Sequence, residues 1–165
     1  SSNCRGNLTV FLINTGMEIS KNGIEFIKHW EGFRPHAYKD LGDVWTIGYG
    51  STLGVKQGQV VFEHVARSML MEEIHKIERV INSKVTVPLT QNQFDALVAF
   101  VYNIGVHAFT NSTALKVLNK GDYRGTTIQM ERWNKVRINK TLVVAKGLQN
   151  RRKAEIELFE RAEQI

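Results

Sequence analysis

The sequence feature that most constrains the fold is a long helical pattern from Gln59 to Asn82. Apolar residues recur along it at helical spacing, and charged residues lie between them. At about 1.5 Å per residue, a helix of this length spans more than 30 Å. In a chain of 165 residues, such a helix is expected to join two lobes. We expect its buried stripe to contain Phe62, Val65, Met69, Ile77 and either Val80 or Ile81.

Shorter patterns lie on both sides of this helix. Ser20 is a candidate N-cap for a helix that ends at Glu31-Gly32, and Thr90 with Gln93 matches a capping box before an apolar helix. Residues 37–50 are typical of a β-hairpin with a turn at Leu41-Gly42-Asp43. Further helices are expected near 112–118 and at 123–133. Residues 134–147 are basic and loop-like, and Arg151-Arg152-Lys153 leads the last helix.

Two carboxylates close together in sequence suggest a chemistry. Glu31 ends a helix beside bulky apolar residues, and Asp40 stands at the hairpin turn, where it is partly hydrated. Thr46 lies on the returning strand and could point toward Asp40. Paired carboxyl groups on different elements are what glycoside hydrolysis requires, one as acid and one as base or nucleophile.

The neighbouring residues suggest where a substrate would lie. Gly48 and Gly50 permit a close backbone approach, as a groove for an extended sugar chain would need. Asn103, at the end of the apolar helix, could point into the same groove; on spacing alone, an ordinary helix-ending Asn fits equally well.

Charge and composition bound the partners. Residues 1–83 contain 9 Lys and Arg against 9 Asp and Glu, whereas residues 84–165 contain 13 against 7, so the excess of +6 lies in the second half. Such a surface attracts polyanions, although a merely solubilising basic face is an equal alternative. No apolar run approaches the roughly 20 residues of a membrane span. No His or Cys spacing suggests a metal, and we expect neither a metal nor another cofactor.

The residues also carry a resemblance. Glu31, Asp40 and Thr46 stand in the pattern Glu-x8-Asp-x5-Thr, followed by Ile47-Gly48-Tyr49-Gly50. Further ordered matches are Val87-Pro88-Leu89-Thr90-x-x-Gln93-Phe94-Asp95-Ala96-Leu97, Phe100-x-Tyr102-Asn103-Ile104-Gly105, Arg132-Trp133 and Gly147-Leu148-x-x-Arg151-Arg152-x-x-Glu155. From Met17 to Ile165 the chain resembles the phage-type lysozymes, or endolysins, of glycoside hydrolase family 24.

The resemblance implies an α+β, mostly helical, two-lobed lysozyme-like fold. A small β-hairpin lobe (17–58) and a helical lobe (83–165) would be joined by the long helix (59–82). It implies a muramidase that hydrolyses the β-1,4 bond from N-acetylmuramic acid to N-acetylglucosamine in bacterial peptidoglycan. We expect the protein to be a monomer. Glu31 would be the general acid, Asp40 would position or activate water, and Thr46 would help to hold it. Tyr49, Asn103 and Gly105 are the implied substrate-binding residues.

Two departures from the family pattern stand out. Many relatives place a His directly after the Gly-x-Gly segment, where this chain has Ser51. Residues 1–16 form an extension whose status is open: Cys4 and the apolar run Leu8–Ile13 fit a truncated signal-anchor, a processed segment or a vector-derived one. We expect the protein to accumulate in the host cytoplasm until release and to act on the wall in the periplasm.

Two other classes of function fit the sequence less well. A non-catalytic wall-binding module is disfavoured by the intact Glu31, Asp40 and Thr46 set. A sequence-specific nucleic-acid binder is disfavoured because the basic residues are not interleaved with aromatics and no helix-turn-helix is recognisable.

Overall fold

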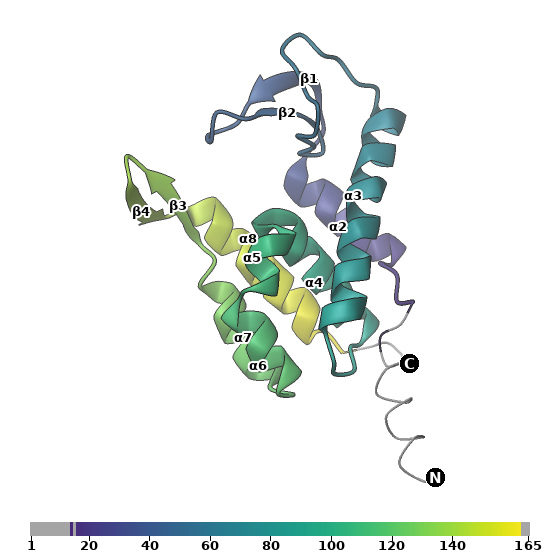
Figure 1. Cartoon of the computed structure of the whole chain (residues 1–165), viewed down its shortest axis with the longest axis vertical. Coiled ribbons are helices and arrows are strands. Elements are labelled where there is room, and N and C mark those ends of the chain that lie inside the picture. The colour runs from purple at the N-terminus through teal and green to yellow at the C-terminus, as the bar shows by residue number, and fades with distance from the viewer. Residues whose placement is uncertain (1–13, 15, 163–165) are drawn as a thin grey trace.

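The computed structural model describes residue 14 and residues 16–162 as a mostly helical protein with two small antiparallel hairpins (Figure 1). The fold therefore agrees with the predicted α+β, two-lobed architecture. The elements, in chain order, are α2 (Lys21–Glu31), β1 (Arg34–Lys39), β2 (Trp45–Gly48), α3 (Glu63–Lys84), α4 (Gln91–Ile104), α5 (Val106–Thr110), α6 (Thr113–Asn119), α7 (Tyr123–Glu131), β3 (Lys135–Ile138), β4 (Thr141–Val144) and α8 (Lys146–Glu160).

The first hairpin, β1–β2, forms the centre of the small lobe at the top of Figure 1. Its register pairs Tyr38 with Thr46 and Lys39 with Trp45, as the predicted turn requires. The segment that follows returns along β1, because the amide of Val61 donates to the Pro35 carbonyl at 2.9 Å. This lobe is therefore held by the hairpin and by the chain that leads into α3.

Helix α3 connects the small lobe to the helical lobe (Figure 1). It begins at Glu63, four residues later than predicted, and its 22 residues span about 33 Å. The predicted buried stripe was partly wrong, because Phe62 and Val65 are exposed. Ile77 and Ile81 are buried as expected, and the rest of the buried face is made by Ala66, Leu70, Ile74 and Glu78. No helix in the described part of the chain is long and apolar enough to cross a membrane.

Helix α4 is the centre of the helical lobe. The predicted capping box is present: Thr90 accepts from the Gln93 amide, and the Gln93 side chain accepts from the Thr90 amide. Every residue from Phe94 to Val101 is buried, and α2, α3 and α8 all pack against this helix. One helix therefore fixes the relative positions of three others, including the two that carry the site.

The prediction of a loop over residues 134–147 was wrong. Strands β3 and β4 form a regular hairpin there, and the last helix begins at Lys146 instead of at Arg151. The turn residues Asn139 and Lys140 both have positive φ, of 48° and 67°. Two consecutive left-handed residues are typical of the tight turns whose twist suits a hairpin. Cys4 and the run Leu8–Ile13 lie outside the described residues.

Candidate active site

Glu31 is presented at the end of α2. The helix begins at Ser20, the predicted N-cap, whose hydroxyl accepts from the Gly23 amide and donates to the buried carboxylate of Asp95 on α4. It ends at Gly32, where a φ of 69° turns the chain away. Because α2 is tied to α4 at its start, its end is held in a fixed position. The Glu31 side chain there keeps 17% of its surface exposed.

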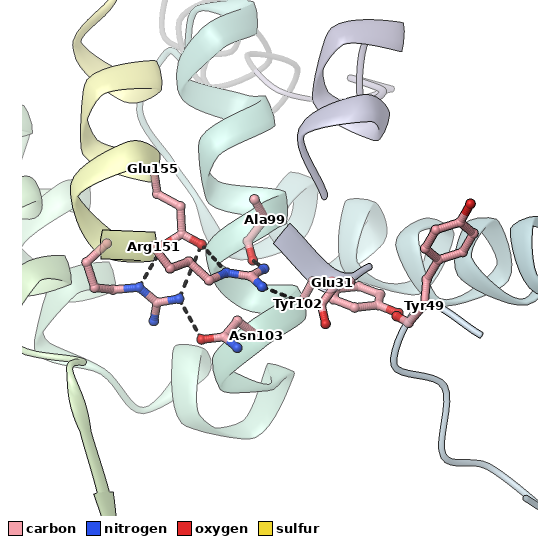
Figure 2. A network of polar contacts seen from close by, with 8 residues as sticks. Glu31, Tyr49, Ala99, Tyr102, Asn103, Arg151 and Glu155 are labelled. Carbon is pink, nitrogen blue, oxygen red and sulfur yellow. Dashed lines mark hydrogen bonds and ion pairs between the residues drawn. The ribbon is translucent and has the colours of Figure 1, made fainter. Parts of the chain in front are cut away.

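A buried arginine holds one oxygen of this carboxylate. Arg151 on α8 donates from Nη1 to Oε1 of Glu31 at 2.6 Å. The same guanidinium donates from Nε to Oε2 of Glu155 at 3.0 Å and from Nη2 to the Ala99 carbonyl at 3.1 Å. Figure 2 shows these contacts converging from α2, α4 and α8. The flat, forked guanidinium therefore fixes the direction of Glu31, which a single flexible ammonium would not do.

A second arginine completes a balanced network. Arg152 forms an ion pair with Oε1 of Glu155 at 2.8 Å, donates to Oδ1 of Asn103 at 2.5 Å, and lies over the Phe100 ring at 5.0 Å. Burial raises the pKa of Glu155 and lowers that of Arg152, because both charged forms are removed from water. With Glu31 and Arg151 included, the network contains two cations and two anions, so no charge is left without a partner of opposite sign.

The other oxygen of Glu31 faces the backbone at Gly50. A Cβ at Gly50 would lie 3.0 Å from Oε2 of Glu31, and φ there is +87°. Glycine is therefore required on two grounds, close approach and left-handed backbone. Tyr102 supports the same segment by donating from its hydroxyl to the Tyr49 carbonyl at 2.6 Å. Burial, with the nearby Glu31 charge second, raises the pKa of Tyr102, so this hydroxyl stays protonated.

A hollow lies next to this point. It has a volume of about 660 Å³ and adjoins Glu31 through Gly50 and Tyr102. It is lined by the chain after β2, by one face of α3 and by one residue of α4: Gly50, Ser51, Thr52, Leu53, Met69, Glu72, Glu73, Lys76 and Tyr102. The Glu31 carboxyl group is therefore at the margin of a space that can hold a substrate.

Asp40 organises the turn between β1 and β2. Its Oδ1 accepts from the amides of Gly42 and Val44, both at 2.9 Å. Its Oδ2 has no hydrogen bond with any residue that the structure describes, and the side chain is exposed. One carboxylate oxygen thus fixes the side chain while the other remains open to water.

Thr46 and Asp40 meet at Val44 without touching each other in the described structure. The Thr46 hydroxyl donates to the Val44 carbonyl at 3.0 Å, whereas Asp40 takes the Val44 amide. Thr46 is buried. The two side chains are therefore linked through the backbone of Val44 and not by a direct hydrogen bond between them.

The three predicted substrate-binding residues are placed in different ways. The Tyr49 side chain is buried and donates to Glu63 at 2.9 Å, and in Figure 2 its hydroxyl points away from Glu31. Asn103 is exposed and accepts from Arg152. Gly105 joins α4 to α5 with a φ of 97°, and nothing lies within 4 Å of the position of a Cβ. Their substrate-binding roles stay predictions.

Sequence reasoning did not identify the residues that hold Glu31. The sequence pattern predicts Arg151 and Arg152 only as the start of a helix, whereas in the structure both are buried and Glu155 is fully buried. The signal was present in the spacing: residues three and four apart lie on one helix face, so Glu155 can meet both arginines. The described part of the chain contains no group of three or more His, Cys, Asp or Glu residues that could hold a metal ion.

The chain is also similar in sequence to known proteins. The sequence model of the phage lysozyme family matches residues 28–155. An endolysin of Acyrthosiphon pisum secondary endosymbiont phage 1 is 43% identical over 88% of this chain and 100% of its own length. A SAR-endolysin of Pseudomonas phage phiKMV is 40% identical over 76% of this chain and 78% of its own length.

A solved structure shares the fold as well. The muramidase domain of SpmX from Asticaccaulis excentricus superposes with a TM-score of 0.82 at 37% identity, over 88% of this chain and 99% of that one. The family match covers Glu31, Asp40, Thr46 and the whole ion-pair network on α8. The chain therefore belongs to the phage lysozyme family.

Proposed function

We propose that this protein is an endolysin that hydrolyses the β-1,4 bond between N-acetylmuramic acid and N-acetylglucosamine in bacterial peptidoglycan. The observation that carries the proposal is the placement of Glu31: a partly exposed carboxyl group, fixed by Arg151, beside a hollow of about 660 Å³. Endolysin and muramidase relatives at 37% identity or more support the substrate.

Glu31 is the general acid in this proposal. Arg151 binds Oε1, so Oε2 is the oxygen that carries the proton to the glycosidic oxygen. Gly50 leaves room beside Oε2 for the scissile bond. An acid fixed in this way loses little entropy when it meets the substrate, which is the advantage of a preorganised site.

Asp40 is the residue that orients or activates the attacking water. Its free Oδ2 can accept a proton from that water, while Oδ1 remains bound to the turn. Thr46 acts through Val44: its hydroxyl donates to the Val44 carbonyl, and the Val44 amide donates to Oδ1 of Asp40. We therefore assign Thr46 a positioning role in this chain, with water contact made by Asp40.

The setting of the reaction follows from the same proposal. The SAR-endolysin relative supports action on the wall from the periplasmic side after release from the cytoplasm. The excess of positive charge in the helical half attracts the enzyme to the acidic wall polymer. The protein acts as a monomer, which sedimentation analysis of the purified chain checks directly.

The first test is mass spectrometry of the fragments released from purified peptidoglycan. Reducing muramic ends are expected, and the Glu31→Gln variant should release none while keeping the melting temperature of the parent to within a few degrees. Glu25→Gln on the same helix is the matched control, because Glu25 is exposed and lies outside the network. Near-normal activity of Glu31→Gln would remove the acid assignment, and anhydro-muramic ends would identify a transglycosylase instead.

A further inference from the structure

The second hairpin has an unusual composition for a surface element. Between Glu131 and Glu155 the chain contains eight Lys or Arg residues and no Asp or Glu. Arg151 and Arg152 are neutralised inside the site. The other six cations are exposed, and none forms an ion pair with a described residue: Arg132, Lys135, Arg137, Lys140, Lys146 and Lys153. Positive charge is therefore concentrated on and around residues 132–146, here named the basic hairpin.

The basic hairpin also exposes its aliphatic side chains. Ile138, Leu142, Val143 and Val144 are 53%, 57%, 42% and 47% exposed. In Figure 1 the two strands project from the helical lobe, at the left of the view. An isolated two-stranded hairpin is marginally stable in water, so leaving four aliphatic side chains exposed on it is costly unless a partner covers them.

The register leaves one face of the hairpin without charge. Because strand residues alternate between faces, the pairs Lys135–Val144 and Arg137–Leu142 lie on one face. The pairs Val136–Val143 and Ile138–Thr141 lie on the other. The second face therefore carries no charge and a single hydroxyl group. The first face combines Lys135 and Arg137 with Leu142 and Val144, and Lys140 adds a cation at the turn.

This arrangement fits a lipid surface better than a sugar polymer. A glycan presents many hydroxyl groups, and an aliphatic face would desolvate them without offering hydrogen bonds in return. A bilayer with anionic headgroups takes up aliphatic side chains at its boundary while its phosphates attract Lys and Arg. A second copy of the chain fits poorly, because two such hairpins would bring like charges together.

We propose that the basic hairpin binds the surface of an anionic phospholipid bilayer, with the uncharged face of Val136, Ile138, Thr141 and Val143 at the headgroup boundary. The long side chains of Lys135, Arg137 and Lys140 reach the phosphates around the edges and the turn of the hairpin. The aliphatic side chains supply contact area, and the cations supply the preference for acidic lipid. This surface is separate from Glu31 and Asp40, so the proposal stands whether or not the protein cleaves peptidoglycan.

The test is cosedimentation of the full chain with vesicles of phosphatidylcholine and phosphatidylglycerol, compared with vesicles of phosphatidylcholine alone. We expect binding to the acidic vesicles only. The triple variant Lys135→Gln, Arg137→Gln, Lys140→Gln should bind them about 100-fold more weakly, since each surface cation contributes about 5-fold.

A matched control keeps the result specific. The variant Lys116→Gln, Lys120→Gln, Arg124→Gln removes the same charge from exposed sites on α6, at its C-cap and on α7. It should lose less than about 5-fold in vesicle binding. Equal losses in the two variants would overturn the proposal, because net charge alone would then explain binding. Failure of the parent protein to bind acidic vesicles would also overturn it.

The aliphatic face is tested separately. Ile138→Thr with Val143→Thr keeps charge and β-branching and should weaken vesicle binding at least about 5-fold. A hairpin variant that loses binding to purified peptidoglycan sacculi, while vesicle binding is kept, would assign the surface to the wall instead. A change of oligomeric state in either hairpin variant would assign it to a second copy of the chain.

Discussion

Replacing Arg151 with methionine would measure how strongly the site depends on its buried charge balance. The substitution keeps a long apolar stem and removes three contacts, to Glu31, Glu155 and the Ala99 carbonyl. Breaking a buried ion pair typically costs about 3–5 kcal/mol. Glu155 keeps its ion pair with Arg152, and Glu31 is partly exposed, so we expect the lower end, about 3 kcal/mol.

The assay is thermal unfolding at neutral pH together with activity on peptidoglycan. For a chain of this size, about 3 kcal/mol corresponds to a fall of about 6–12 °C in melting temperature. Below the melting transition, kcat should fall about 100-fold, because Oε1 of Glu31 loses its fixed donor. Arg124→Met, at an exposed site on α7, is the control and should change stability by no more than about 0.5 kcal/mol.

A double variant tests whether the buried charges act as one network. Adding Glu155→Gln to Arg151→Met restores one cation and one anion, Arg152 and Glu31. The loss of unfolding free energy in the double variant should therefore be smaller than the sum of the losses in the two single variants, by about 1–3 kcal/mol. Strict additivity would refute the view that these charges form one network, and so would a stability of Arg151→Met equal to that of the parent.

Three further predictions concern the support around the site. Gly50→Ala should cost about 1–3 kcal/mol and most of the activity, because φ is +87° and the new Cβ would meet Oε2 of Glu31; unfolding and fragment release measure both, and an alanine variant with full activity would contradict the close approach. Tyr102→Phe should cost about 1–2 kcal/mol by leaving the Tyr49 carbonyl unpaired; denaturant unfolding checks this, and no change would mean that water replaces the hydroxyl. The hydrogen bond from the Tyr49 hydroxyl lowers the pKa of Glu63. The stability gained from this carboxylate is therefore complete above its ordinary pKa of about 4.5 and is lost as pH falls through the lowered value. The melting-temperature difference between the parent and Glu63→Gln should shrink from pH 7 to pH 3, and a constant difference would argue against the contact.

The sequence was sufficient for the parts of the fold that depend on local patterns. The Ser20 and Thr90 caps and the β1–β2 turn were predicted because each relies on residues only a few positions apart. The same holds for the apolar face of α4, since every position from Phe94 to Val101 is buried and no choice of face was needed. Local chemistry decides these features, and the printed residues contain it.

The second hairpin escaped prediction for a physical reason. Strand β4 is Thr-Leu-Val-Val, which shows no alternation, and Lys and Arg alternate with Val and Ile in β3. Alternation identifies a strand when one face packs on a core, but both faces of this hairpin are exposed. The turn uses Asn139-Lys140 instead of the Asn-Gly pair that usually marks it.

Long-range effects account for the other differences. The buried face of α3 is shifted because Gly48 approaches Ala66 closely: a Cβ at Gly48 would lie 2.9 Å from that of Ala66. Arginine side chains are usually exposed on the protein surface. Arg151 is buried only because it forms ion pairs with Glu155 and with Glu31, which lies 120 residues earlier. No window along the sequence contains that arrangement.

That separation of 120 residues has a consequence for the time at which the site comes into existence during synthesis. The ribosome makes Glu31, Asp40 and Thr46 early, and the small lobe can form around them. The guanidinium that fixes Glu31 arrives only with α8, the last helix that the structure describes. A nascent chain therefore has the two carboxylates that we propose as catalytic before it has the ion pair that orients Glu31. For an enzyme whose action destroys the cell that makes it, competence is delayed until translation of the helical lobe is nearly finished.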